Sequence, residues 1–133
     1  MSIVIDASLV IAALLDSGKQ GAWAERVLEA DSLHAPELLR AEATNILRRL
    51  ERARRISSAE ANAAHDDLMQ LDVELFTFDP FAERIWELRH TVTSHDAWYV
   101  ALAEALKLPL ATLDQKLAKA SGVACDIVTP ASG

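Results

Sequence analysis

The chain has 133 residues, of which 51% are hydrophobic and 25% are charged, and its formal net charge is −7 at pH 7. A chain of this length buries enough surface to fold as one domain, which we expect to span residues 1–133. The single cysteine, Cys125, excludes an internal disulfide framework, and the acidic total argues against nonspecific binding to a polyanion. No secretory signal and no apolar run of about 18 residues is present, so we expect a cytoplasmic protein with no membrane segment.

In the N-terminal half, short apolar runs alternate with segments that carry apolar residues at helical spacing. In chain order we expect a strand over residues 2–5, helices over 9–15 and 22–30 separated by a break over 18–21, a strand over 32–35 and a long helix over 37–54. Asp6 ends the first of these strands and Pro36 ends the second.

The second half continues this alternation and contains two signals for helix starts. Ser57 and Glu60 have the spacing of a capping box. Pro80 stands in the first turn of a helix that we expect Asp79 to cap. In chain order we expect a helix over 57–71, a strand over 73–76, a helix that begins at 79, a helix over 96–106, a strand over 110–112, a helix over 115–120 and a strand over 126–128.

Short apolar strands between helices predict an α/β fold with a mostly parallel sheet that is covered on both faces. In such sheets, ligands bind beyond the carboxyl ends of the strands. Asp6 follows the first strand directly, and Asp114 follows the strand over 110–112 after one intervening residue. The sequence therefore predicts carboxylates at the edge of the sheet where ligands bind.

Four acids form a candidate site: Asp6, Glu42, Asp96 and Asp114. Asp6 interrupts an apolar stretch, where a charge costs free energy unless it is paired, metal-bound or at the edge of the core. Glu42 and Asn45 share a helix face because they are three residues apart. Each acid also has an ordinary explanation, as a helix cap, a first-turn acid or an exposed helix residue. Spacing alone leaves open whether the four converge.

Four segments of the sequence carry a family resemblance. They are IVIDAS, APELLRAEATNIL, SHDAWYVALAEAL and LPLATLD, in this order, within residues 3–117. The ordered set resembles the motifs of the PIN-domain family and is closest to its VapC-type toxin ribonucleases. The resemblance implies a three-layer α/β/α sandwich with a mostly parallel central sheet. It also implies an endoribonuclease that cleaves RNA phosphodiester bonds.

The resemblance further implies site residues and a cofactor. By their positions in the motifs, the catalytic and metal-binding acids are Asp6, Glu42, Asp96 and Asp114, and the supporting polar residues are Ser8, Asn45 and Thr112. The implied cofactor is Mg²⁺, with Mn²⁺ as an alternative, and the nucleophile is a water that the metal activates. The set contains only oxygen ligands, which suits a hard cation rather than zinc. The number of metal ions is left open.

The same resemblance implies two protein partners, a VapB-like antitoxin and a second copy of the chain in a homodimer. Arg48, Arg49 and Arg52 are candidates for contacts with RNA or with the antitoxin, and a solvated helix face is the ordinary alternative. Trp86 lies off the apolar face of its expected helix and is a candidate for a dimer contact. Two other functions stay open: a PIN nuclease that is not a toxin and acts in RNA processing or on DNA, and a catalytically silent PIN binding module.

Overall fold

The computed structural model describes residues 1–130 and has a five-stranded sheet at its centre. The strands are β1 (Ser2–Ile5), β2 (Ser32–Pro36), β3 (Glu74–Phe76), β4 (Leu110–Ala111) and β5 (Ile127–Val128). Their order is β3-β2-β1-β4-β5, and every neighbouring pair is parallel. The prediction of an α/β fold with a mostly parallel sheet is therefore confirmed.

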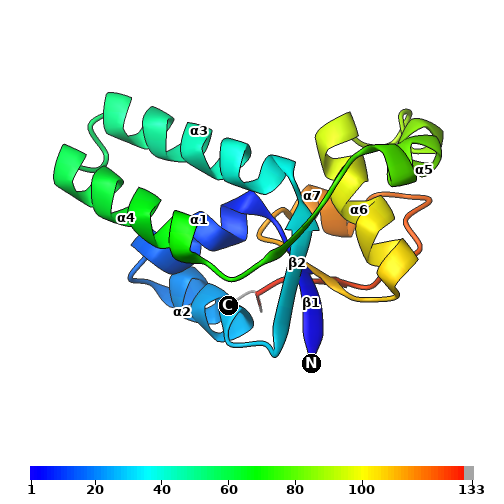
Figure 1. The fold of residues 1–133 in the computed structure, drawn as a ribbon, viewed down its shortest axis with the longest axis horizontal. Helices are drawn as coiled ribbons and strands as arrows, with labels where there is room; N and C mark the ends of the chain where they lie inside the picture. The colour runs from blue at the N-terminus through cyan, green and yellow to red at the C-terminus, as the bar shows by residue number, and fades with distance from the viewer. Residues whose placement is uncertain (131–133) are drawn as a thin grey trace.

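Helices cover the sheet on both sides. They are α1 (Ala7–Leu15), α2 (Lys19–Leu28), α3 (Leu38–Arg52), α4 (Ser58–Gln70), α5 (Ala82–Glu87), α6 (Ser94–Leu106) and α7 (Gln115–Ala118), with a 3-10 turn, η1, at Asp79–Phe81. Figure 1 shows α1 to α4 on one side of β1 and β2, and α5 and α6 on the other side. This is the three-layer arrangement that the family resemblance implies.

The burial of the central strand β1 shows why helices must cover both faces of the sheet. Val4 pairs with His34 on β2 and with Leu110 on β4, so β1 has a neighbour on each edge. Val4 and Ile5 are fully buried, as expected for a strand covered on both faces. Leu9 of α1 and Leu102 of α6 are also fully buried, each from a helix on a different side of the sheet.

The expected break over residues 18–21 is wrong, because α2 begins at Lys19 and contains Gly21. Gly21 packs against the backbone at the end of α1, where there is no room for a side chain. A Cβ atom at this position would lie 1.8 Å from the backbone oxygen of Asp16. The glycine therefore serves the close approach of α1 and α2 rather than a turn.

The helix expected to begin at Asp79 is also different in the structure. Asp79–Phe81 forms the 3-10 turn, which contains Pro80, and the α-helix starts only at Ala82. Asp79 makes no capping hydrogen bond there, since Phe78 occupies the cap position. The capping box of Ser57 and Glu60 is confirmed, with both reciprocal hydrogen bonds at 3.0 Å. Apart from the starts of α2 and α5, the other boundaries lie within two residues of the expected ones.

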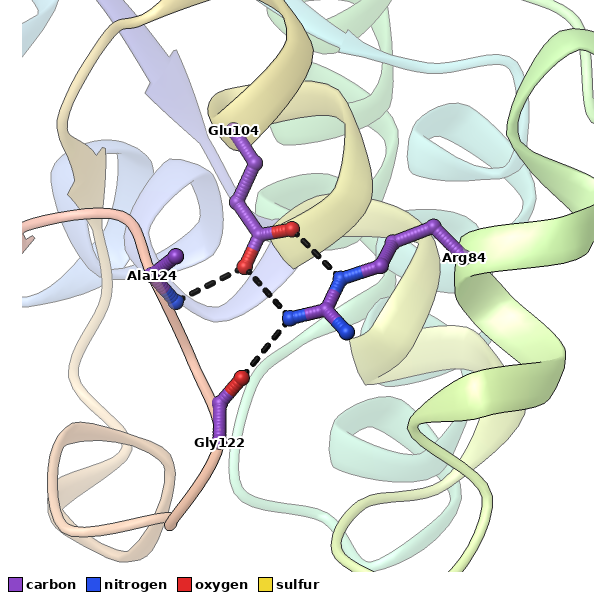
Figure 2. Close-up of polar contacts among 4 residues, drawn as sticks. All are labelled: Arg84, Glu104, Gly122 and Ala124. Carbon is purple, nitrogen blue, oxygen red and sulfur yellow. Dashed lines mark hydrogen bonds and ion pairs between the residues drawn. The ribbon is translucent and has the colours of Figure 1, made fainter.

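A polar clamp joins α5, α6 and the segment that precedes β5 (Figure 2). Arg84 Nε donates to Glu104 Oε1 at 2.7 Å, and Arg84 Nη2 donates to Glu104 Oε2 at 3.0 Å and to the Gly122 carbonyl at 2.7 Å. The backbone N–H of Ala124 donates to Glu104 Oε2 at 2.7 Å. Burial alone would raise the pKa of Glu104, but these hydrogen bonds and the charge of Arg84 outweigh it and lower the pKa.

Among the described helices, none combines the length and the apolar composition that crossing a bilayer requires.

Candidate active site

A cleft of about 380 Å³ lies at the carboxyl ends of β1 and β4, the edge where the sequence predicted carboxylates. Its lining contains all four predicted acids, together with Ser8, Asn45, Arg49, His95 and Tyr99. The fold thus brings together side chains from the two central strand ends and from helices on both sides of the sheet. We call this hollow the acidic cleft.

Asp6 caps α1 and is held by three hydrogen bonds. The backbone N–H of Leu9 donates to Asp6 Oδ1 at 3.0 Å, the Ser8 hydroxyl donates to the same oxygen at 2.9 Å, and the Thr112 hydroxyl donates to Oδ2. Burial raises the pKa of Asp6, the three hydrogen bonds oppose this rise, and the charge of Asp96 adds to it. The ordinary explanation as a cap is therefore correct, and the same carboxylate also lines the acidic cleft.

Asp114 caps the short helix α7 in a similar way. Its Oδ1 accepts from the backbone N–H groups of Lys116 and Leu117 at 2.9 and 3.3 Å. Its own backbone N–H donates to the Thr112 hydroxyl at 3.0 Å. The buried Thr112 hydroxyl therefore connects Asp6 with Asp114, which supports its predicted role beside the acids.

Asp96 lies in the first turn of α6, but it is not the cap of that helix. Thr93 takes the cap position, and its hydroxyl accepts from the backbone N–H of Asp96 at 3.2 Å. Burial raises the pKa of Asp96 and the charge of Asp114 raises it further, against smaller opposing effects of Thr93 and His95. Burial and the charge of Asp114 therefore disfavour the ionised form of Asp96 more than Thr93 and His95 favour it.

Glu42 is held by a residue that sequence reasoning missed. The Tyr99 hydroxyl donates to Glu42 Oε1 at 2.6 Å, and His95 Nδ1 lies 3.9 Å from Glu42 Oε2. Burial and this hydrogen bond raise the pKa of Tyr99, so its hydroxyl stays a proton donor. Tyr99 follows Asp96 by three residues on α6, and this helical spacing was the available signal.

The predicted arginines divide into two groups. Arg49 lines the acidic cleft, whereas Arg48 and Arg52 are exposed on α3 and do not line it. The cleft therefore has one arginine beside its acids.

The donor chemistry of the acidic cleft fits a hydrated hard cation. Within residues 1–130, no group of three or more His, Cys, Asp or Glu side chains is arranged to hold a metal ion directly. Mg²⁺ usually keeps several waters and binds proteins through one or two carboxylates, so it does not need such a cage. Burial is the largest cause that raises the pKa values of Asp6 and Asp96, and a neighbouring acid raises each further, so a bound cation would favour their ionised forms.

Comparison with known proteins gives consistent matches. Residues 3–123 match the model of a protein family described as "PIN domain". The chain is 42% identical over 125 residues to Ribonuclease VapC1 of Mycobacterium tuberculosis, a match that covers 93% of this chain and 94% of that protein. Its fold is similar to PAE2754 from Pyrobaculum aerophilum (TM-score 0.71, 23% identity, 95% of this chain and 83% of that one). It is also similar to VapBC-5 from M. tuberculosis, a member of the VapBC family of toxin-antitoxin systems (TM-score 0.62, 21% identity, 96% and 98%).

Proposed function

The chain belongs to the PIN domain family, and from this premise we propose that it is a metal-dependent endoribonuclease and the toxin of a toxin–antitoxin pair. The observation that carries the proposal is the convergence of Asp6, Glu42, Asp96 and Asp114 on one cleft at the carboxyl ends of the central strands. The name of the relative VapC1, a ribonuclease, supports RNA as the substrate.

Asp6, Asp96 and Asp114 would hold a divalent ion, directly or through water, and Mg²⁺ or Mn²⁺ suits their oxygen atoms. Such an ion supplies charge that lowers the pKa of a bound water and offsets negative charge on the phosphate. Ser8 and Thr112 fix the direction of the Asp6 carboxylate through their hydrogen bonds.

Glu42 would orient the attacking water or bind a second ion. The hydrogen bond from Tyr99 engages Oε1, whereas Oε2 lies 3.9 Å from His95 Nδ1. Asn45 lines the same hollow one helical turn after Glu42 and would contribute a neutral polar contact. This arrangement gives Glu42 one fixed oxygen and one oxygen for water.

We propose a VapB-like antitoxin and a second copy of the chain as protein partners, in the cytoplasm. The likeness to the VapBC-5 structure supports an antitoxin, since that protein is a member of a toxin-antitoxin family. Arg48 and Arg52 remain candidates for this contact because both are exposed on α3. Arg49 is better placed for RNA, because it lines the acidic cleft.

The test is cleavage of a panel of structured RNAs by the purified protein with Mg²⁺, with EDTA and as the Asp96→Asn variant. We expect cleavage that requires Mg²⁺ and falls by roughly 10²–10³-fold in the variant, the size of effect that follows removal of a group that stabilises transition-state charge. Arg26→Gln, an exposed change on α2, is the matched control and should cleave normally. Cleavage that survives both EDTA and Asp96→Asn would contradict the proposal. Mg²⁺ binding without cleavage of any RNA would favour a silent binding module.

A further inference from the structure

A second hollow, of about 480 Å³, adjoins the acidic cleft. It lies between the turn that follows α5, over residues 89–93, and helix α7. Asp96 and Asp114 line both hollows, so the two meet at these carboxylates. An RNA strand bound across these two carboxylates would therefore continue into the second hollow.

The second hollow carries positive charge that the structure leaves available. Arg89 and Lys116 both line it and both are exposed. Within residues 1–130, neither forms an ion pair with a carboxylate. Arg84, which is close in sequence to Arg89, is instead neutralised by Glu104. Arg89 and Lys116 are thus cations without a structural counter-ion in the described chain, beside two acids that would repel a polyanion.

The side chain of Arg89 is held in place by Trp86. Arg89 Nη1 donates to the Trp86 carbonyl at 2.9 Å, and the guanidinium carbon lies 4.3 Å from the centre of the Trp86 ring. This is the geometry of a cation–π contact. The Trp86 residue is 66% exposed, and holding Arg89 gives it a role that needs no second protein chain. A guanidinium fixed in this way loses less entropy when it binds a phosphate.

We propose that this hollow, the Arg89–Lys116 groove, binds the RNA phosphates next to the bond that is cleaved. The inference rests on the proposed ribonuclease function and adds the path of the strand to it. The acids that bind the metal ion repel the phosphates flanking the scissile one, so those phosphates need cations nearby. Arg49 lies on the acidic cleft, and the groove supplies Arg89 and Lys116 next to the same acids. The strand then crosses Asp96 and Asp114 between these two positive flanks.

The test is binding of a short, fluorescently labelled, single-stranded RNA of mixed sequence, measured by anisotropy in Ca²⁺ over a series of KCl concentrations. For a single strand, removing one phosphate-binding cation reduces the slope of log K against log salt by about 0.7. We expect this reduction in Arg89→Gln and in Lys116→Gln, with a weakening of about 3- to 10-fold at low salt. Arg89→Lys should keep the slope because it keeps the charge, and Arg26→Gln should match the wild type.

Three outcomes would overturn the inference. Groove variants with the wild-type salt slope would show that Arg89 and Lys116 do not contact the RNA. Variants that bind RNA normally but escape inhibition by the antitoxin would show that the groove binds the antitoxin instead of RNA. In either case, Mg²⁺-dependent cleavage by the wild type would leave the proposed function standing. If the wild type neither binds nor cleaves RNA, the proposed function and the groove fall together.

Discussion

Two regions of the molecule use carboxylates in opposite ways. In the clamp, Glu104 accepts hydrogen bonds from Arg84 and from the backbone of Ala124, and its pKa is lowered. In the acidic cleft, burial first and a neighbouring acid second raise the pKa values of Asp6 and Asp96. The first arrangement stabilises the charged form within the fold, whereas the second leaves charge that an external cation can stabilise.

This difference separates an acid that supports the fold from the acids that we propose to bind a metal ion. A carboxylate that gains its counter-charge inside the chain supports the fold and has nothing left for a ligand. A carboxylate kept near other carboxylates costs free energy in the folded state until something binds. Substitutions that change one region at a time should therefore shift stability with opposite signs in the two regions.

The largest expected change in stability comes from the clamp. Glu104→Ala removes the acceptor of both Arg84 and the Ala124 N–H, and we expect the free energy of unfolding to fall by about 2 kcal/mol. Chemical denaturation measures it, with Glu25→Ala on the exposed side of α2 as the control. Mg²⁺-dependent cleavage by the folded variant should stay at the wild-type level. An unchanged free energy of unfolding would mean that the clamp contributes nothing to the fold.

Tyr99→Phe should affect the acidic cleft with little effect on the fold. The substitution removes only the hydroxyl that holds Glu42, so we expect RNA cleavage to fall about 10-fold, as for other residues that orient a site carboxylate. A double-mutant cycle with Glu42→Ala provides the control, because that change removes the acceptor and Tyr99→Phe should then have no further effect. Equal reductions in both backgrounds would show that Tyr99 does not act through Glu42.

Asp96→Asn should stabilise the protein when no metal is present, in contrast to Glu104→Ala. Removal of this charge relieves the cost of burying it and its repulsion by Asp114, and we expect a gain of about 0.5 kcal/mol in the free energy of unfolding in EDTA. Mg²⁺ should stabilise the wild type more than the variant, because a ligand stabilises only the folded state that binds it. A variant less stable than the wild type in EDTA would contradict this account of the cleft.

The smallest effect is a difference in acid titration. The lowered pKa of Glu104 means that its contribution to stability is present above the ordinary value of 4.5 and is lost as pH falls through the folded pKa. The raised pKa of Asp96 acts in the opposite direction, since its favourable contribution is present below 3.8 and is lost as pH rises through the folded pKa. Denaturation over acidic pH should therefore show that Glu104→Ala loses stability relative to the wild type as pH rises, and Asp96→Asn gains it. Parallel curves for the two variants would contradict these directions.

The sequence was sufficient for those parts of the fold and site that depend on local pattern. Alternating strands and helices predicted the parallel sheet, and the strand-end positions of Asp6 and Asp114 predicted where carboxylates would meet. The position of Glu42 beside them came only from the family resemblance, because nothing within α3 distinguishes it from an exposed helix residue.

The features that the sequence did not predict depend on contacts between distant residues. Gly21 has the local signature of a break but lies inside α2, and its close approach to the Asp16 backbone shows why no side chain fits at this position. Tyr99 has the signature of a core aromatic, and its hydrogen bond reaches Glu42, 57 residues away in the sequence. No local pattern carries information about such partners.

The hydrogen bond between Thr112 and Asp6 has a consequence for the growing polypeptide on the ribosome. Asp6 is made early, but the hydroxyl that holds it lies 106 residues later, on the segment that also carries Asp114. During translation, Ser8 and Leu9 can therefore hold Asp6 Oδ1 early, whereas Oδ2 lacks its hydrogen bond until Thr112 has been made. A nascent chain that ends before β4 lacks both Thr112 and Asp114, so the proposed nuclease site cannot assemble while most of the protein is still being synthesised.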